Sequence, residues 1–327
     1  AFRGKYYANY RKKRYLCTHL KCNSMNRMND KVNQIADYCE MIGATPLHPL
    51  IHVVDFGRLP PIHFSNLRRV FGYYAIYLKE VKFTDLRYGT GIYDYQPDTL
   101  VCFAPGQVAG SEDDGKLHQV KGHALLFHPD LLKGTYLLPF LKEYTYFDYS
   151  LREAIQLDAA EKQTFLGLLH SIEEELKRKE ASDTAILIDY LKLLLDYCRR
   201  FYERQFDVRL TENKALLELF DQLLDQYFAS NKPLLQGVLT VAYCAGELCL
   251  STNYFSDLVK KATGLSALKH IHLKMLTYAK ELLACQKEAL GDIAGKLGFQ
   301  YAAHFSTWFK KQTGCTPLEY RNTVWQK

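Results

Sequence analysis

The sequence predicts an α+β fold, with a small antiparallel β-barrel and accompanying helices in the N-terminal part and only helices in the C-terminal part. Between about residues 46 and 150, short runs rich in Val, Ile, Tyr and Phe alternate with turn residues. After Asp148 the apolar residues recur at helical spacing instead. A chain of 327 residues is long enough for two or three domains.

The composition is that of a globular protein. Hydrophobic residues make up 48% of the chain and charged residues 24%, which excludes a mainly disordered protein. No run of about 18 apolar residues is present, so a membrane-spanning helix is not expected. The cysteines are scattered, without a Cys-x-x-Cys pair, and no secretory signal is recognised. This pattern predicts reduced thiols and a cytoplasmic protein.

The net charge of +6 is distributed unevenly along the chain. Residues 1–24 carry seven basic side chains and no acidic one, residues 25–212 have a net charge of −5, and residues 213–327 have +4. We expect residues 1–24 to be a disordered or non-native extension, with natural initiation at Met25 or Met28. The alternative is a basic arm that binds nucleic acid.

Five short segments in residues 25–150 are predicted strands. They are bounded by turn-forming Pro, Gly and Asp residues, a spacing that is typical of a small antiparallel barrel or sandwich. The predicted strands are Ile51–Asp55, Tyr73–Leu78, Leu86–Tyr95, Leu100–Ala104 and Ala124–His128.

Residues 151–212 are predicted to be a helical region, with helices from Ser150 to Lys179 and from Asp183 to about Gln205. The second helix carries two adjacent apolar stripes, although one stripe is enough to dock a helix on a domain. A second chain could cover the spare stripe, so we expect a homodimer. The alternative is a helix enclosed within its own domain. The dimer stripe would consist of Ile188, Leu191, Leu195, Cys198 and Tyr202.

The C-terminal part contains an internal repeat. Residues 259–266 (VKKATGLS) are matched 50 residues later by residues 309–316 (FKKQTGCT). Further upstream the offset is 49, so the copies differ by one residue inserted in a turn. Other matched pairs are Phe255-Ser256 with Phe305-Ser306, and Ala245 with Ala294.

Each copy of the repeat is predicted to be a helix-turn-helix. A short helix, a turn and a second helix follow one another, and the second helix ends in Lys-Lys, Thr and a C-capping Gly. The second helix of such a motif enters the DNA major groove. A spacer helix from about Leu268 to Leu283 would span about 24 Å. It could hold two recognition helices roughly one DNA turn, about 34 Å, apart.

The turn of the first copy has Cys249 where the second copy has Gly298. A tight turn at this position favours a positive φ, which a residue other than glycine adopts at a cost.

The repeat also carries a long, spaced signature. Its members are Ala294, Gly298-Phe299, Phe305-Ser306, Phe309-Lys310-Lys311, Thr313-Gly314, Thr316-Pro317 and Tyr320-Arg321. In these residues the sequence resembles the AraC family of bacterial transcription regulators, over about residues 215–323. Residues 93–107 and 121–132 more loosely resemble the cupin-type sensor half of Bacteroidetes members.

The resemblance implies a cupin-like sensor domain at residues 25–150 and a double helix-turn-helix DNA-binding domain at residues 213–327. It implies double-stranded DNA and RNA polymerase as partners, no cofactor, and control by a small-molecule effector in general. The sequence leaves open whether the regulator activates or represses.

The candidate base-reading residues lie on the outward faces of the two recognition helices. Asn can pair with adenine, Ser with several base edges, and Asp with cytosine N4. Asp257 departs from the Arg that the family often has at this position. Besides accepting from cytosine, its carboxylate could pair with a neighbouring Lys or be a solvated or capping side chain. The small side chains of the second helix suit thymine methyls and predict a less discriminating reader. The candidates are Thr252, Asn253, Ser256 and Asp257 on the first helix, and Ala302, Ala303, Ser306 and Thr307 on the second.

The candidate phosphate-binding residues are basic side chains near the ends of these helices. Phosphate contacts supply affinity without sequence information. The alternative is a solvated charged face, but the pair Lys-Lys recurs at equivalent sites in both copies, which favours the phosphate interpretation. The candidates are Lys260, Lys261, Lys310, Lys311 and Arg321.

A ligand pocket in the sensor half would use aromatic faces and a few polar tips. The candidate residues are Tyr88, Tyr93, Tyr95, Phe103 and His123. The alternative is that these side chains simply fill the barrel.

No metal site or enzymatic motif is predicted. The histidines of the sensor half form no His-x-His pair, and His270 and His272, two apart on a helix, do not face each other. A phosphate-binding loop, a dinucleotide fingerprint and a Gly-x-Ser-x-Gly motif are not found either. The competing function is a cupin-type small-molecule-binding or catalytic protein with a helical interaction tail. It would bind its ligand tightly and show no sequence preference on DNA.

Overall fold

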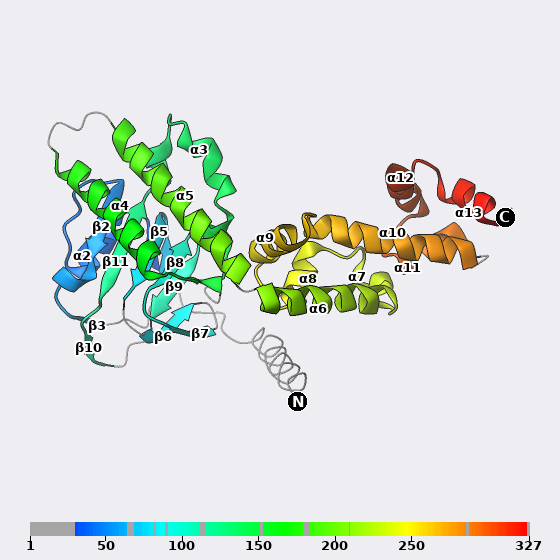
Figure 1. Ribbon diagram of the computed structural model, residues 1–327, viewed down its shortest axis with the longest axis horizontal. Coiled ribbons are helices and arrows are strands. Elements are labelled where there is room, and N and C mark those ends of the chain that lie inside the picture. The colour runs from blue at the N-terminus through cyan, green and yellow to red at the C-terminus, as the bar shows by residue number, and fades with distance from the viewer. Residues whose placement is uncertain are drawn as a thin grey trace. The chain divides into compact units, whose positions relative to one another are not determined.

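The computed structural model (Figure 1) describes residues 30–63, 69–80, 83–88, 91–111, 115–150, 153–178, 184–208, 210–285 and 288–325. The chain divides into two units between Val208 and Arg209. Among the described residues, the N-terminal unit contains all of the strands and the C-terminal unit only helices. This confirms a mixed fold with a helical C-terminal part. The extension predicted at residues 1–24 lies outside the described residues.

Within its described residues, the N-terminal unit contains two five-stranded sheets and a two-stranded ribbon. The first sheet has the order β12-β8-β5-β11-β2, with β2 Ile51–Asp55, β5 Tyr74–Lys79, β8 Thr99–Phe103, β11 Gly122–Phe127 and β12 Ile155–Gln156. The second has the order β1-β4-β9-β6-β7, with β1 Asp30–Val32, β4 Arg69–Phe71, β6 Phe83–Tyr88, β7 Gly91–Tyr95 and β9 Val108–Ser111. The ribbon pairs β3 Ile62–His63 with β10 Leu117–His118.

The predicted strands are found, but the predicted closed barrel is not. Within the described residues, β12 and β2 remain edge strands of the first sheet, and β1 and β7 of the second, because no ladder joins the two sheets. The pairing is not wholly antiparallel either, since β1 runs parallel to β4. The single strand expected at Leu86–Tyr95 is part of a hairpin formed by β6 and β7.

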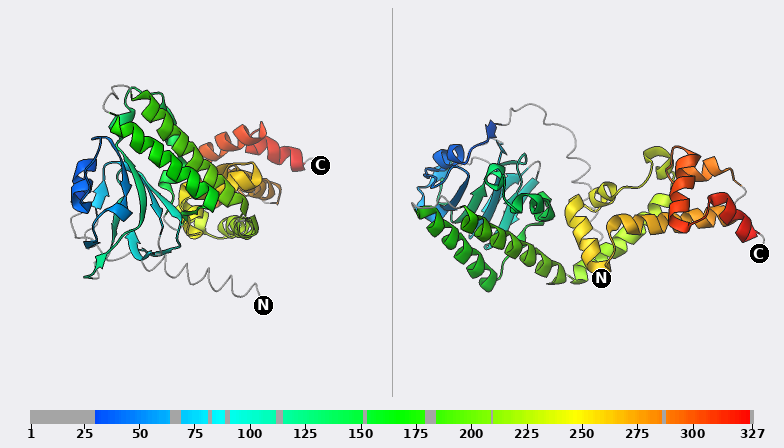
Figure 2. Two further views of the ribbon diagram at one scale, coloured as in Figure 1. Left: turned by 60° about the vertical axis from the view of Figure 1, so that its left-hand side comes forward. Right: turned by 90° about the horizontal axis from the view of Figure 1, so that it is seen from above.

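The two faces of the first sheet pack against different partners. Ala75, Phe103 and Ala124 point to the face that packs on helix α2 (Ile35–Ile42). On the opposite face, Figures 1 and 2 show α4 (Ala159–Lys177) and α5 (Ala185–Val208) lying across the sheet. Strand residues therefore alternate between two apolar environments, which explains why β8 is buried along its whole length.

Helix α4 begins at Ala159 rather than at Ser150. Asp158 and Glu161 form a reciprocal capping box, in which the Glu161 N–H donates to Asp158 Oδ1 at 2.8 Å and the Asp158 N–H to Glu161 Oε2 at 3.1 Å. Such a cap satisfies backbone donors that a helix start leaves free. Ile155, placed in the helix by its spacing, instead lies in β12.

Helix α5 (Ala185–Val208) buries the predicted stripe within its own unit. Tyr146 stacks on Tyr202, with ring centroids 5.3 Å apart, and its hydroxyl donates to the Leu195 carbonyl at 3.0 Å. The stripe assigned to a dimer contact is therefore part of the core of this unit, the alternative that the sequence left open. Its buried members are Ile188, Leu191, Leu195, Cys198 and Tyr202.

The C-terminal unit consists of eight helices within the described residues. They are α6 Leu210–Phe228, α7 Lys232–Gln236, α8 Val241–Glu247, α9 Thr252–Thr263, α10 Ala267–Cys285, α11 Leu290–Lys296, α12 Ala302–Thr313 and α13 Pro317–Trp325. The predicted spacer helix corresponds to α10. The two copies of the repeat correspond to α8–α9 and α11–α12.

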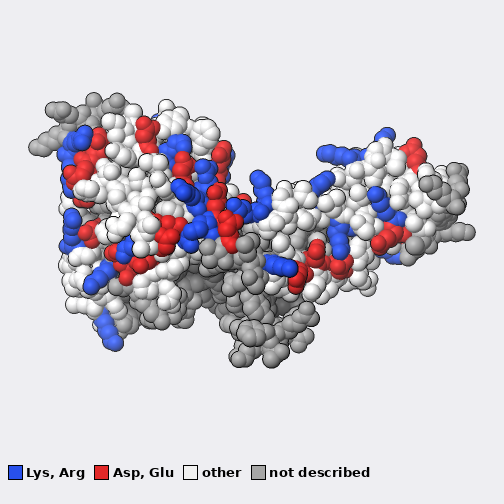
Figure 3. Space-filling model, viewed as in Figure 1, with Lys and Arg blue, Asp and Glu red and all other residues white. Residues whose placement is uncertain are grey.

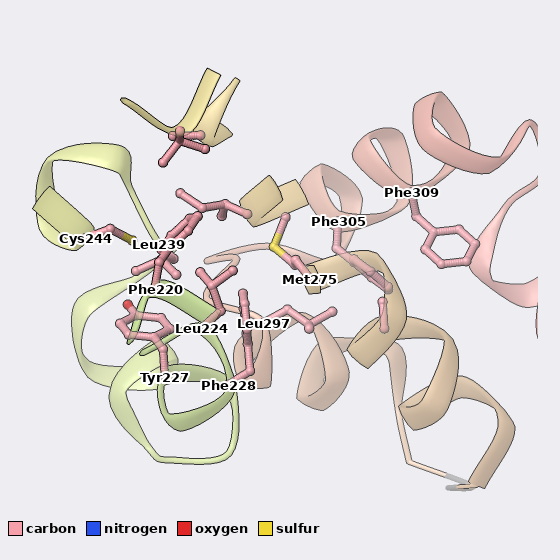
Figure 4. Packing of buried hydrophobic residues seen from close by; sticks show 14 of the residues in the cluster. Phe220, Leu224, Tyr227, Phe228, Leu239, Cys244, Met275, Leu297, Phe305 and Phe309 are labelled. Atoms are coloured by element: carbon pink, nitrogen blue, oxygen red, sulfur yellow. The ribbon is translucent and has the colours of Figure 1, made fainter. Parts of the chain in front are cut away.

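One hydrophobic core serves both copies of the repeat. Figure 4 shows Phe220 from α6, Met275 from α10 and Phe305 from α12 in a single cluster. Phe255 of α9 belongs to the same cluster and meets Phe220 edge to face, with ring centroids 4.9 Å apart. Burial of these rings holds the helices together, because the stabilisation grows with the apolar area removed from water.

In the described part of the chain, we find no helix that combines the length and the apolar character required to cross a bilayer.

Candidate nucleic-acid interface

Helices α9 and α12, the predicted recognition helices, end in the same way. Gly264 after α9 and Gly314 after α12 have φ values of 76° and 85°, and each donates its N–H to a lysine carbonyl four residues earlier at 2.8 Å. The acceptors are Lys260 and Lys310. Both glycines are thus left-handed C-caps, as the sequence predicts. The shared cap gives the two lysine pairs equivalent positions on their helices.

The helix starts differ between the copies. The Ser251 hydroxyl accepts from the Tyr254 N–H at 3.3 Å and caps α9. The corresponding position before α12 is Tyr301, which makes no side-chain cap bond.

The turns within the two copies share a backbone conformation. Cys249 has a φ of 58° and Gly298 a φ of 90°, so the positive φ expected at this position is confirmed in both. The next residue closes the turn in each copy: Leu250 donates to Ala245 at 2.9 Å, and Phe299 donates to Ala294 at 2.8 Å. A side chain at Cys249 therefore does not prevent the first turn from forming.

Each recognition helix buries one face and leaves the other open. Phe255, Leu258 and Val259 are buried on α9, and Phe305 and Phe309 on α12. Among the predicted base-reading residues, three are exposed and five are half-buried. The exposed residues are Thr252, Ala303 and Thr307, and the half-buried ones are Asn253, Ser256, Asp257, Ala302 and Ser306.

The hydroxyls on these faces bond to their own helix. Ser256 donates to the Thr252 carbonyl at 2.8 Å, and Ser306 donates to the Ala302 carbonyl at 2.9 Å. Thr307 makes the same bond to Ala303 at 2.9 Å. Because a hydroxyl has one donor and two acceptor lone pairs, these oxygens remain able to accept a hydrogen bond from a base.

The basic side chains of the two copies are placed alike. Lys260, Lys261, Lys310 and Lys311 are all exposed. Figure 3 shows basic side chains along the edge of the C-terminal unit that carries α9 and α12, whereas most acidic side chains in view lie on the opposite edge. Arg321 differs, because it is half-buried and its Nε and Nη2 atoms are shielded from solvent.

Sequence reasoning missed an aromatic pair at the start of α12. Tyr301 and His304 are exposed, and their rings meet edge to face with centroids 5.4 Å apart. The repeat offset contained a signal for this difference. It aligns Tyr301 with the capping Ser251 and His304 with Tyr254, which is buried. The second copy therefore presents polar aromatic tips where the first presents none.

Two of the residues proposed for an effector pocket, Phe103 and His123, are not brought together. Phe103 is buried on the α2 face of the first sheet and meets the Tyr77 ring edge to face at 5.6 Å. His123 lies on the other face, half-buried, 3.6 Å from Glu80 and 3.9 Å from Asp55. Alternation along strands separates the two side chains. The side chains of Tyr88, Tyr93 and Tyr95 lie outside the described residues.

The histidines of the spacer helix have separate partners. His270 bonds to the Thr263 hydroxyl at 2.9 Å, whereas His272 contacts the Trp308 ring. No cluster of His, Cys, Asp and Glu side chains suited to a metal ion occurs among the residues that the structure describes.

Comparison with known proteins adds to this geometry. Residues 244–323 match the family model described as a helix-turn-helix domain. The chain is 23% identical to the HTH-type transcriptional activator RhaR of Mannheimia succiniciproducens, over 65% of this chain and 72% of that protein. It is 32% identical to the arabinose operon regulatory protein of Escherichia coli, over 25% of this chain and 28% of that protein. A solved AraC-type transcriptional regulator from Chromobacterium violaceum is 21% identical, with a TM-score of 0.30, over 35% of this chain and 96% of its own.

The C-terminal unit is thus a helix-turn-helix domain. The regulators named above are similar to this chain, which agrees with the resemblance seen in the sequence. The relatives named above are transcriptional regulators and not enzymes. This chain spans most of the first relative but less than a third of the second.

Proposed function

We propose that this protein is a sequence-specific DNA-binding transcription regulator whose helices α9 and α12 enter successive major grooves. The observation that carries the proposal is the recurrence of an exposed Lys-Lys pair before the same glycine cap in both copies. Exposed lysines at matched positions suit two phosphate backbones one helical turn apart.

The length of α10 supports two simultaneous contacts. Its 19 residues span about 28 Å. Figures 1 and 2 show α9 at the start of α10 and α12 farther along it. One turn of DNA is about 34 Å, so both recognition helices would reach the same side of the duplex.

The two helices would divide the work of base recognition. Asn253 on α9 offers the amide that pairs with adenine, and the hydroxyl oxygens of Ser256 and Ser306 accept from base edges. Ala303 and the Thr307 methyl group on α12 suit thymine methyls. The lysine pairs would supply most of the affinity.

The test is selection of duplexes from a random library by the full-length protein, followed by fluorescence anisotropy on the selected and a scrambled duplex. We expect at least a tenfold preference for the selected duplex. Asn253→Ala should reduce this preference by about 1–3 kcal/mol, whereas Asn33→Ala in the N-terminal unit should not. Failure to enrich any sequence would contradict the proposal.

Dimerisation would use a surface other than the predicted stripe. Five large apolar side chains are exposed on α5, on α3 (Leu137–Phe140) and at the residue before α3. The Tyr136 hydroxyl donates to Asp189 of α5, and this hydrogen bond links the two segments. We expect a second copy of the chain to cover them. In sedimentation analysis, Leu193→Lys should favour the monomer, and Leu117→Lys on the distant ribbon should not. The five side chains are Tyr136, Leu138, Phe140, Ile186 and Leu193.

Effector control through the N-terminal unit is the last part of the proposal. We expect a small apolar or aromatic ligand, because Phe103 and Tyr77 place aromatic rings on the α2 face of the sheet. Such a ligand would act by binding two states of the protein unequally, so that transcription by RNA polymerase changes. A compound that raises the melting temperature and alters affinity for the selected duplex would support this part. With the Phe103→Ala variant, the compound should change neither the melting temperature nor the affinity for the selected duplex.

A further inference from the structure

Tyr227, near the end of α6, lies between the two copies of the repeat. It is 2% exposed, and its hydroxyl donates to the Gly237 carbonyl at 2.8 Å. Its ring meets the ring of Tyr243 on α8, with centroids 5.3 Å apart. Figure 4 shows Tyr227 beside the core, on the same helix as Leu224 and Phe228. One side of this residue therefore contacts the first helix-turn-helix, and the other side contacts the segment after α7.

That segment lies directly against the turn of the second helix-turn-helix. A Cβ added to Gly298 would lie 2.3 Å from the Gly237 oxygen and 2.6 Å from the Val238 nitrogen. Distances this short mean that the two backbones touch, with no room for a side chain between them. Next to this contact, Leu234 of α7 packs on Gly295 of α11.

The turn of the first copy has no equivalent contact. Cys249 occupies the matching position and carries a side chain at a φ of 58°. A Cβ is accommodated there, so no backbone can lie against it as Gly237 lies against Gly298. The asymmetry between Cys249 and Gly298, visible in the sequence, thus reflects a contact that only the second copy makes.

We infer that Tyr227 is a positioning residue that sets the placement of the second helix-turn-helix relative to the first. Its ring contacts Tyr243 of α8. Its hydroxyl donates to the Gly237 carbonyl and holds it against the turn at Gly298, which precedes α12. The inference rests on the proposed function, since it concerns the distance between two recognition helices on DNA. According to this inference, Tyr227 determines which spacing between two DNA half-sites the protein prefers.

The test compares full-length wild type and Tyr227→Phe, which keeps the ring contact with Tyr243 and removes the hydroxyl. The probes are the duplex selected by wild type, the same duplex with a few base pairs inserted between its half-sites, and a duplex with one half-site. We expect Tyr227→Phe to bind the selected duplex about fivefold more weakly, which corresponds to one hydrogen bond. It should bind the single half-site as wild type does and discriminate less between spacings.

Matched variants separate positioning from loss of structure. Tyr278→Phe removes a hydroxyl that bonds the Asp225 carbonyl at 3.4 Å in the same unit, and it should bind as wild type does. Gly298→Ala should show the Tyr227→Phe pattern more strongly, whereas Cys249→Ala should not show it. The folded fraction of each variant is measured by circular dichroism, and its DNA affinity is corrected for that fraction.

An equal loss on the single half-site and on the selected duplex would overturn the inference, and so would an unchanged spacing preference. If wild type itself selects no sequence, the proposed function fails, and this inference fails with it.

Discussion

His272 on α10 meets Trp308 on α12 edge to face, with their ring centroids 5.9 Å apart. The contact joins the spacer helix to the second recognition helix. Burial lowers the pKa of His272, and the positive charges of Lys269 and Lys311 lower it further. The folded protein therefore favours the neutral form of this imidazole.

The stability of the protein should depend on His272 at mildly acidic pH. A histidine with a lowered folded-state pKa binds its proton more readily when unfolded, so stability falls as pH drops below about 6.5. The melting temperatures of wild type and His272→Gln should be compared between about pH 7 and pH 5. Over this range we expect the melting temperature of wild type to fall further than that of His272→Gln.

Other histidines do not obscure this comparison. Burial also lowers the pKa values of His48 and His52, but these residues are present in both proteins. Parallel curves for wild type and His272→Gln would show that protonation of His272 is not linked to folding.

Gly298→Ala should destabilise the protein by about 1–3 kcal/mol. The added Cβ meets the Gly237 backbone, and the positive φ of 90° is itself unfavourable for alanine. Urea denaturation followed by circular dichroism measures the effect. Cys249→Ala is the matched control, since it places the same side chain at the same kind of turn, and should cost less than half as much.

Phe255→Ala and Phe305→Ala should each destabilise the protein by about 3–5 kcal/mol. Both rings are fully buried in one core, although they belong to different copies of the repeat. A cooperative loss measured by denaturation is expected for both. Leu265→Ala, at an exposed position in the same unit, should change the stability by less than about 0.5 kcal/mol. Two separate transitions in either variant would argue against a shared core.

The lysine pairs should appear as a salt dependence of DNA binding. Replacement of Lys260 or Lys310 by Gln should reduce the slope of log K against log salt by about 0.9 each, because one phosphate contact is lost. The selected and the scrambled duplex should be affected equally. Lys142→Gln, exposed on the N-terminal unit, should leave the slope unchanged. A slope that does not respond to Lys260 or Lys310 would mean that these side chains are only solvated.

Much of the C-terminal unit could be predicted because its signals are local. A capping serine, a capping glycine and a turn with positive φ each depend on a few neighbouring residues, and Ser251, Gly264 and Cys249 behave as their positions imply. The repeat doubled each signal. The burial of Phe255 and Phe305 follows from the same helical spacing.

The parts that could not be predicted depend on contacts between distant segments. Closure of a barrel requires a ladder between particular edge strands, and apolar alternation along a strand carries no information on which strand is its neighbour. The same gap placed Phe103 and His123 in one pocket, although they lie on opposite faces of the sheet. The two apolar stripes of α5 are predicted from spacing, but spacing does not show which distant side chains cover them, such as Tyr146, which stacks on Tyr202.

The shared core makes the two copies of the repeat mutually dependent. Each copy has its own caps and its own turn, yet Phe220, Met275 and Phe305 belong to a single cluster. A chain that ended at Cys285 would leave open to water the part of α10 that packs on α11 and α13. The copies are alike in sequence but are not modules, and neither can be exchanged, duplicated or deleted alone without rebuilding the interior that both use.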